Sequence, residues 1–133
     1  MQPEQLLYAK SHEWAAVETN DAGEKIVTLG LSKFALDALT DLVFVELFEP
    51  GQTIEVGERF GEIESVKTVS DLYSPVAGEI VQRNDDVADD LDSISNDPYG
   101  AGWLVKLKVT DEAGLAALAD FDAYQKQCAE EQH

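Results

Sequence analysis

The spacing of apolar and polar residues predicts a chain built mainly of short strands. Segments rich in apolar and β-branched residues alternate with clusters of glycine, proline, asparagine and aspartate, which is typical of strands and their turns. We expect the strand at 42–48 to be buried because its residues form an almost continuous apolar run. Closely spaced short strands favour a small β-barrel or sandwich. The expected strands cover residues 6–18, 25–31, 42–48, 59–66, 69–73, 79–83 and 103–109, with a shorter one between Gly51 and Gly57 that places Ile54 and Val56 on one face.

Helical spacing occurs in two parts of the chain. A short helix is expected after Ser32, its cap, with an apolar face made of Phe34, Ala35, Ala38 and Leu39. C-terminal helices are expected over about residues 111–131, the first capped by Thr110 and packed through Leu115, Leu118 and Ala119. Residues 84–102 are acidic and are expected to form a loop with little regular structure. Because no linker separates strands from helices, we expect residues 1–133 to form one domain.

The charge of the chain excludes several kinds of partner. Twenty-seven acidic and nine basic residues give a net charge of −18. Nucleic acid and anionic membranes repel such a chain, whereas basic proteins attract it. No apolar run approaches the ~18 residues of a membrane span, and residues 1–10 lack the features of a secretory or transit peptide. We expect a soluble, cytoplasmic monomer, or a mitochondrial matrix protein if a transit peptide has been removed.

Residues with catalytic or metal-binding potential are few. His12 and His133 have no nucleophile at a recognisable spacing, and we interpret His12 as structural. The single cysteine, Cys128, shares helical spacing with Phe121 and Tyr124, so it is expected to pack as a small hydrophobe. The acidic pairs within residues 85–90 lack the spacing of a calcium loop. We therefore expect neither an enzyme nor a metal site.

The clearest local feature is a hairpin over residues 59–73 with one lysine, Lys67, at or beside its tip. Apolar residues recur at strand spacing on both arms: Phe60, Ile63 and Val66 before the lysine, Val69 and Leu72 after it. A rigid hairpin would make the lysine amine available for modification. Most exposed lysines are simply solvated, so spacing alone does not separate these two interpretations.

Four motifs in order along the chain resemble those of a known family. They are Ser-His-Glu-Trp at 11–14, Asp-Leu-Val-Phe-Val-Glu-Leu at 41–47, Glu-Ser-Val-Lys-Thr-Val-Ser-Asp at 64–71 and Asn-Asp-Pro-Tyr-Gly-Ala-Gly-Trp at 96–103. The third motif, followed by Tyr-Ser-Pro-Val-Ala-Gly-Glu-Ile, resembles the lipoylation segment of the glycine cleavage system H proteins. Four ordered motifs are far more specific than one short match. The resemblance therefore favours a modified lysine at position 67.

The resemblance implies a mainly β fold, the flattened barrel or sandwich of lipoyl and biotinyl carriers with small α additions. It implies that lipoate is attached to Lys67. Glu64, Asp71, Gly51 and Gly78 match positions linked to recognition by the lipoylating enzymes. Carboxylates beside the lysine suit a basic enzyme surface, and glycines shape the turns.

The same resemblance implies a cleft for the loaded arm. Ser11, Glu13 and Asp71 match residues that hold the aminomethyl-bearing arm at the surface of the family's proteins. A carboxylate there would pair with the ammonium of the arm and protect it from hydrolysis.

The implied function is that of a shuttle in glycine cleavage, with the chemistry carried by the cofactor. A pyridoxal-phosphate glycine decarboxylase, the P protein, would supply the aminomethyl group of glycine. A tetrahydrofolate-dependent aminomethyltransferase, the T protein, would receive it. The flavin enzyme dihydrolipoamide dehydrogenase, the L protein, would restore the oxidised arm.

Two positions depart from the family's pattern. Lys33 stands where an acid is expected, and Thr40 stands where glycine is usual after the short helix. These departures bear on partner docking through that helix rather than on lipoylation.

Other functions use the same residues. An H-like protein that relays lipoyl groups to 2-oxoacid dehydrogenases would also be modified at Lys67. A lipoyl domain of such a dehydrogenase would sit on a longer chain with linkers, and a biotin carrier would place methionines beside the lysine, where Val66 and Thr68 stand. From a different class, an unmodified acidic interaction module would make Lys67 incidental.

Overall fold

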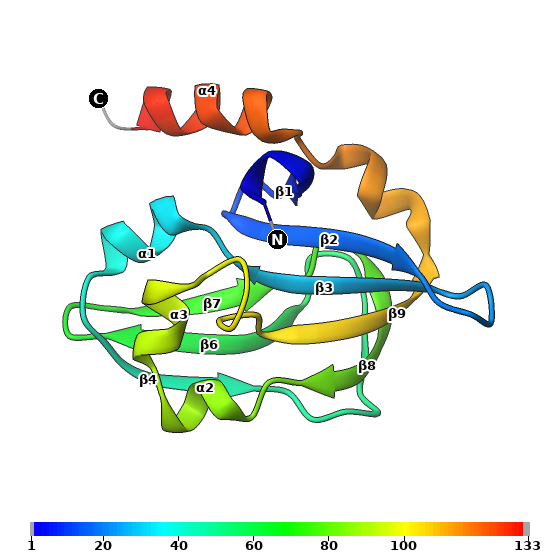
Figure 1. The fold of residues 1–133 in the computed structure, drawn as a ribbon, viewed down its shortest axis with the longest axis horizontal. Helices are drawn as coiled ribbons and strands as arrows, with labels where there is room; N and C mark the ends of the chain where they lie inside the picture. The colour runs from blue at the N-terminus through cyan, green and yellow to red at the C-terminus, as the bar shows by residue number, and fades with distance from the viewer. Residues whose placement is uncertain (1, 132–133) are drawn as a thin grey trace.

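The computed structural model describes residues 2–131 as two antiparallel sheets that share an apolar core (Figure 1). The larger sheet has the strand order β1-β2-β3-β9-β8-β5, and the smaller has the order β4-β6-β7. Both sheets contribute fully buried side chains to one cluster, among them Leu29, Ile63, Leu72, Ile80 and Leu107. The mainly β class and the sandwich expected from the sequence are confirmed.

The strands of the larger sheet are β1 (Leu7–Tyr8), β2 (Glu13–Thr19), β3 (Lys25–Leu31), β5 (Thr53–Ile54), β8 (Ala77–Arg83) and β9 (Val105–Asp111). Those of the smaller sheet are β4 (Leu42–Leu47), β6 (Arg59–Ser65) and β7 (Val69–Tyr73). The helices are the 3₁₀ turn η1 (Pro3–Gln5), α1 (Lys33–Leu39), α2 (Asp86–Asp89), α3 (Asp92–Asn96), the 3₁₀ helix η2 (Glu112–Ala117) and α4 (Phe121–Glu131).

The first expected strand, residues 6–18, is wrong as a single element. The chain reverses between β1 and β2, which pair with each other in antiparallel register. The reversal is closed by hydrogen bonds from the Ala9 N–H to the Glu13 carbonyl and from the His12 N–H to the Ala9 carbonyl, each 2.9 Å long. An apolar-rich run does not reveal a turn that lacks glycine and proline, so the sequence pattern missed this one.

The helix α1 begins where the sequence predicts. Ser32 caps it by accepting a hydrogen bond of 3.3 Å from the Ala35 N–H. Its buried side chains are Leu36 and Leu39, whereas Ala38, assigned to the apolar face, is exposed. The cap is confirmed, and the buried face is rotated from the expected one.

The expectation that strand 42–48 is buried is wrong. β4 lies at the edge of the smaller sheet, and Val43 and Phe44 remain 52% and 43% exposed. Val56 is also 53% exposed although Ile54 is buried, so these two residues do not share an inward face. An edge strand can carry apolar side chains that its own domain leaves uncovered, and a continuous apolar run does not distinguish it from a central strand.

Residues 84–102 contain more regular structure than expected. The helices α2 and α3 anchor this acidic segment through Val87 and Ile94, both with 0% exposure. The strand β9 then continues through Thr110, the expected cap, and Asp111 caps η2 instead by accepting a hydrogen bond of 2.9 Å from the Ala113 N–H. The strand β8 begins at Ala77, two residues earlier than expected.

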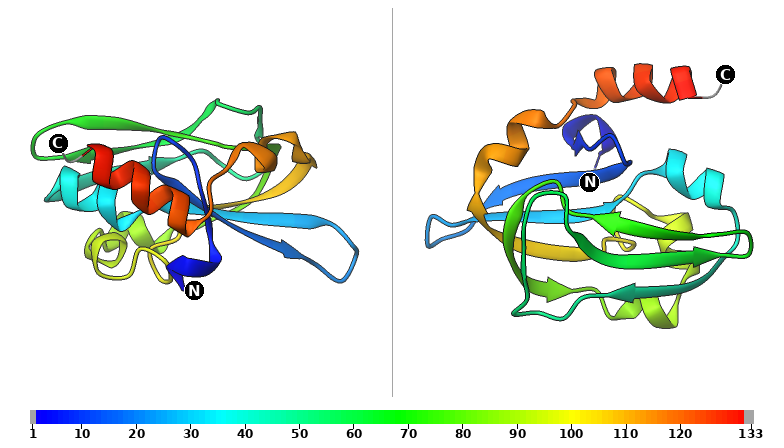
Figure 2. Two further views of the ribbon diagram at one scale, coloured as in Figure 1. Left: turned by 90° about the horizontal axis from the view of Figure 1, so that it is seen from above. Right: turned by 180° about the vertical axis from the view of Figure 1, so that it is seen from behind.

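The C-terminal helix α4 packs over β1 and β2 through a second apolar cluster. Tyr8, Trp14 and Tyr124 form its buried part, and Phe121 and Cys128 pack against them. This confirms the packing role expected for Cys128. Both Figure 1 and Figure 2 place the β6–β7 turn, α1 and the C-terminal end of α4 at the same end of the molecule. Within residues 2–131, no helix has the length and apolar character that crossing a membrane requires.

Candidate functional site

The turn that carries Lys67 is fixed by its own backbone hydrogen bonds. The strands β6 and β7 pair up to Glu64 and Val69, so residues 65–68 form the connection. The Ser65 N–H donates to the Thr68 carbonyl at 2.8 Å, and the Ser65 hydroxyl oxygen accepts from the N–H groups of Lys67 and Thr68, both at 3.2 Å. The Val66 N–H donates to the Asp41 carbonyl at 3.0 Å, which ties the turn to the start of β4. All four backbone N–H groups of the turn therefore have acceptors.

The side chain of Lys67 extends from this rigid turn into solvent. Lys67 is exposed, and within residues 2–131 it forms no ion pair. The amine is therefore accessible, while hydrogen bonds hold the backbone of the turn that carries it. An enzyme that modifies the amine meets it in one defined place, which reduces the entropy lost on binding.

Acidic residues lie beside the lysine on the outer face of the smaller sheet. The strand register places Glu64 between Phe44 and Val69 in one cross-strand row. The next row consists of Glu46, Glu62 and Asp71. Residues that face one another across strands lie on the same side of the sheet, so the two predicted recognition carboxylates share the surface around Lys67.

Asp71 is held by two neighbours. The Arg59 guanidinium lies 3.6 Å from one carboxylate oxygen, and the Tyr73 hydroxyl donates to the other at 3.3 Å. The negative charge of Asp71 and its hydrogen bond raise the pKa of the exposed Tyr73 phenol. Asp71 is thus already paired, in part, with a positive charge.

A groove of about 480 Å³ runs beside the turn, between β7 and α1. On one side it is bounded by β7, starting at Thr68 next to the lysine and continuing through Ser70 and Asp71. Four apolar residues of α1 form the other side: Phe34, Ala35, Ala38 and Leu39. Ser11, His12 and Glu131 also line it. The groove therefore offers an apolar wall and polar groups within reach of a group attached at Lys67.

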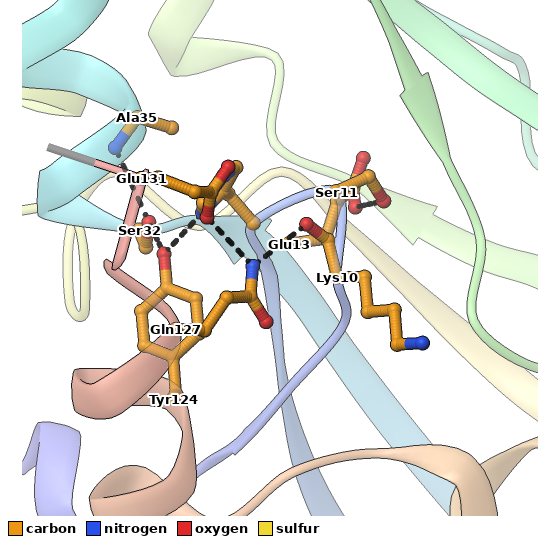
Figure 3. A network of polar contacts seen from close by, with 9 residues as sticks. Lys10, Ser11, Glu13, Ser32, Ala35, Tyr124, Gln127 and Glu131 are labelled. Atoms are coloured by element: carbon orange, nitrogen blue, oxygen red, sulfur yellow. Dashed lines mark hydrogen bonds and ion pairs between the residues drawn. The ribbon is translucent and has the colours of Figure 1, made fainter. Parts of the chain in front are cut away.

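Glu13 supports this groove from behind rather than facing it. Its side chain is 1% exposed and is not among the groove residues. One carboxylate oxygen accepts a hydrogen bond from Ser11, and the other accepts from the Tyr73 N–H at 2.9 Å (Figure 3 shows the Ser11 contact). Burial raises the pKa of the Glu13 carboxyl, an effect that the bonds from Ser11 and Tyr73 oppose. Glu13 thereby joins the turn before β2 to β7.

The two predicted recognition glycines lie on the larger sheet, apart from the lysine. Gly51 precedes β5 with a positive φ of 98°, and its N–H donates to the Ile80 carbonyl at 2.7 Å. Gly78 lies in β8, where an added Cβ would approach the Lys108 carbonyl oxygen to 2.6 Å. Figure 1 shows that β8 starts at the end of the molecule opposite the β6–β7 turn. Gly51 therefore allows a turn, and Gly78 allows two strands to approach each other closely.

Sequence reasoning missed two polar residues of the groove wall and one of the turn. His12 was interpreted as structural, and its imidazole does bond to α4, but it also lines the groove. Glu131 comes from the last described turn of α4, far from the lysine in sequence. Ser65 fixes the turn through a side-chain bond. Only the packing of α4 brings the first two together, and no local spacing signals it.

Comparisons with known proteins show the family of the chain. A family model described as Glycine cleavage H-protein matches residues 6–131. The chain is 50% identical over 128 residues to a glycine cleavage system H protein of Rhodopirellula baltica, with 96% of each chain covered, and 48% identical over 125 residues to one of Alcanivorax borkumensis, with 94% of each covered. It is similar to the crystal structure of a glycine cleavage system H protein from Mycobacterium marinum, with a TM-score of 0.85, 40% identity, and coverage of 96% of this chain and 99% of that one. The chain belongs to the glycine cleavage H-protein family.

Proposed function

We propose that this chain is the lipoyl-carrying shuttle of a glycine cleavage system, with the lipoyl group joined through an amide to Lys67. It acts as a carrier and not as a catalyst. The observation that carries the proposal is an exposed lysine on a fully hydrogen-bonded turn that opens onto a groove. Membership of the H-protein family supports the same function.

The residues around Lys67 fit a lipoyl group. The groove begins at Thr68, the next residue, and its α1 wall is apolar, which suits the aliphatic part of such an arm. Ser70 and Asp71 place polar groups on the opposite wall. When attached, the lipoyl group supplies a sulfur atom that carries the aminomethyl group of glycine.

The chain's own residues supply position and electrostatics. The turn bonds of Ser65 fix the root of the arm, and the apolar wall lets the arm leave bulk water. Asp71 and Ser11 face the groove, where they can accept hydrogen bonds from an ammonium group. The buried Glu13 accepts a hydrogen bond from Ser11 and so orients it, which makes the role of Glu13 in the groove indirect.

This function implies several protein partners, each of which acts on the lipoyl arm in one chemical state. They are the P protein, the T protein, the L protein and the enzymes that attach lipoate. Glu64 and Asp71 border Lys67 on an acidic face, and a net charge of −18 favours partners with basic docking surfaces. Gly51 and Gly78 would contribute to recognition through the shape of the larger sheet.

The test is transfer from glycine. The lipoylated chain is incubated with the P protein and labelled glycine, and the label bound to the chain is measured. We expect label on the native chain and none on Lys67→Arg, which keeps the charge but cannot form the amide. Equal labelling of both would contradict the proposal.

The relay function makes a different prediction in the same system. A chain that serves only 2-oxoacid dehydrogenases would be lipoylated but would accept no label from glycine. An interaction module would show no lipoylation at all.

A further inference from the structure

Two sheets have four outer edges, and within residues 2–131 three of these edges are covered or very short. At the edge of β1, Tyr8 and Ala119 exchange two backbone hydrogen bonds of 2.8 and 2.9 Å. The helix α2 packs along β4, and Arg83 donates to the Leu47 carbonyl at 3.3 Å. The strand β5 has only two residues. Such edges do not readily pair with another strand, which leaves β7 as the open edge.

The hydrogen bonds of the β6–β7 hairpin show which backbone groups of β7 face this open edge. The Ser65 N–H donates to the Thr68 carbonyl at 2.8 Å, so these two residues form a hydrogen-bonded pair. Bonded and non-bonded pairs alternate along an antiparallel ladder. The first and third pairs beyond the turn, which contain Val69 and Asp71, are therefore non-bonded. The N–H and C=O groups of Val69 and Asp71 point away from β6.

These backbone groups are free, whereas the next group in the series is occupied. The Tyr73 N–H faces the same edge and donates to the buried Glu13 carboxylate at 2.9 Å, which closes one end of the edge. The N–H groups of Val69 and Asp71 have no acceptor within residues 2–131. The Val69 carbonyl accepts only a long contact of 3.5 Å from the Thr68 hydroxyl. The open edge therefore lies between Glu13 and the lysine turn.

The groove between β7 and α1 gives an added strand room at this edge. In Figures 1 and 2, β7 is the strand of the smaller sheet on the side of α1, and the groove has a volume of about 480 Å³. A strand rises about 3.4 Å per residue and lies about 4.8 Å from its neighbour, so three residues cover the edge from Val69 to Asp71. The middle one lies opposite Ser70, which lines the groove, and its side chain meets the apolar wall of α1.

The other side chains of an added strand extend the cross-strand rows on the outer face of the smaller sheet. The row that ends at Asp71 has three carboxylates, and one guanidinium, that of Arg59, lies 3.4 Å from Glu62 and 3.6 Å from Asp71. Negative charge therefore remains beside the open edge. The neighbouring row ends at Val69, which is 55% exposed. A basic side chain opposite Asp71 and an apolar one opposite Val69 complement these rows.

We propose that β7 accepts an extended segment of a partner protein as a fourth strand of the smaller sheet. The segment runs antiparallel to β7, the more stable pairing, and carries a basic residue opposite Asp71, then two apolar residues opposite Ser70 and Val69. Backbone hydrogen bonds supply affinity, and the alternating side chains supply specificity. The inference goes beyond the proposed function, because this contact needs no lipoyl group on Lys67.

The test is a titration of the isotope-labelled full chain with the peptide acetyl-Thr-Lys-Val-Val-Thr-amide, followed by amide NMR. For so short a segment we expect a dissociation constant of about 1 mM. At five times that concentration, hydrogen exchange of the Val69 and Asp71 amides should slow about sixfold. A peptide with glutamate in place of lysine should slow their exchange less.

Two methylated peptides provide the matched control. The N–H of the second valine points toward β7 in the proposed pairing, whereas the N–H of the first valine points away from it. N-methylation of the second valine should abolish the slowing, and N-methylation of the first should preserve it. Equal binding of the two methylated peptides, or slower exchange spread over the acidic surface, would overturn the inference, because charge alone would then explain the association.

A variant of the chain tests the same edge from the other side. Val69→Pro removes an N–H that takes no part in the ladder with β6, so the hairpin should stay folded, and slow exchange of the Ser70 amide checks this. We expect the peptide to leave exchange at Asp71 unchanged in Val69→Pro and to slow it in Val69→Thr as in the native chain. Native binding by folded Val69→Pro would contradict strand addition. None of these results depends on lipoate, so the proposed function stands or falls separately.

Discussion

At the scale of single residues, the site depends on a serine that fixes the lysine turn. Ser65 is 6% exposed, and its hydroxyl accepts from two backbone N–H groups that would otherwise lack acceptors within residues 2–131. The Ser65 hydroxyl oxygen therefore fixes the turn together with the bonds of the Ser65 and Val66 N–H groups to the Thr68 and Asp41 carbonyls.

Replacing Ser65 by alanine should loosen the turn without unfolding the sheet. Two N–H groups lose their acceptor, which should lower the free energy of unfolding by about 1–2 kcal/mol. Denaturant unfolding measures this change, and hydrogen exchange at Lys67 and Thr68 should become faster. Ser95→Ala, at an exposed serine of α3, is the matched control. Native exchange in the turn of Ser65→Ala would show that the hydroxyl is dispensable.

The buried carboxyl of Glu13 should give a distinct pH dependence. Its pKa is raised from 4.5 in the folded chain, mainly by burial, so the folded state holds the proton more tightly than the unfolded state. Stability from this group is present below pH 4.5 and is lost as pH rises through the raised pKa. The stability of native protein relative to Glu13→Gln should therefore fall as pH rises from 4.5.

Urea unfolding of both proteins from pH 4 to 8 measures this difference. Glu18→Gln, on the exposed half of the same strand, controls for the loss of one charge. A difference between native and Glu13→Gln that stays constant with pH would show that the raised pKa does not contribute to stability.

The sequence predicted the position of Lys67 in its hairpin better than the surroundings of that lysine. The hairpin pattern and the motif around Lys67 lie within fifteen residues, so local spacing was enough to place the lysine at a turn. Ser11 and Asp71 were matched by resemblance and do meet in one groove. His12 and Glu131 were not expected there because their contact joins residues 119 positions apart. Contacts of that separation depend on packing, which no short motif encodes.

At the scale of elements, Thr40 links α1 to the lysine turn. It follows the helix with φ 67° and ψ −127°, a conformation that glycine adopts readily and threonine does not. The carbonyl of the next residue, Asp41, accepts a hydrogen bond from the Val66 N–H. Thr40, which stands where the resemblance implies glycine, therefore places backbone strain beside the Lys67 turn.

Replacing Thr40 by glycine should stabilise the protein. Relief of strain outweighs the greater freedom that glycine gives the unfolded chain, and we expect a gain of about 1 kcal/mol in the free energy of unfolding. Thr40→Ala is the control, because it removes the hydroxyl bond to the Leu39 carbonyl but keeps the Cβ. A gain in the alanine variant equal to that in the glycine variant would exclude backbone strain as the cause.

The sequence predicted the strands and helices that have a clear local residue pattern. It did not predict those whose position depends on packing against the rest of the chain. The strands β3, β6 and β7, the Ser32 cap and the helix α4 lie close to their expected places. The edge position of β4 was missed because Val43 and Phe44 look like core residues in sequence. The helices α2 and α3 were missed because they are short and acidic, and each is held by one buried residue, Val87 or Ile94.

At the scale of the whole molecule, two apolar clusters meet through shared strands. The larger cluster fills the space between the sheets, and the smaller one fastens α4 to β1 and β2. Ala15 of β2 belongs to the first cluster, whereas Trp14 and Ala16 belong to the second. One strand thus serves both clusters on its two faces.

From this arrangement we propose that residues 1–133 unfold as one domain. Tryptophan fluorescence reports on Trp14 and Trp103, which both belong to the smaller cluster beside α4, and far-UV circular dichroism reports on both sheets. Because β2 couples the clusters, the two urea transitions should share one midpoint. An earlier fluorescence transition would mean that α4 detaches before the sheets unfold.

Intact mass with peptide mapping tests the proposal that Lys67 carries a lipoyl group. The native chain and Lys67→Arg are expressed in cells supplied with lipoate, where a known lipoyl protein confirms that the attaching enzymes are active. We predict a lipoyl-sized increase on the peptide that contains Lys67 and no increase in the variant. An unmodified native chain, or a lipoyl group on another lysine, would contradict the proposed attachment at Lys67.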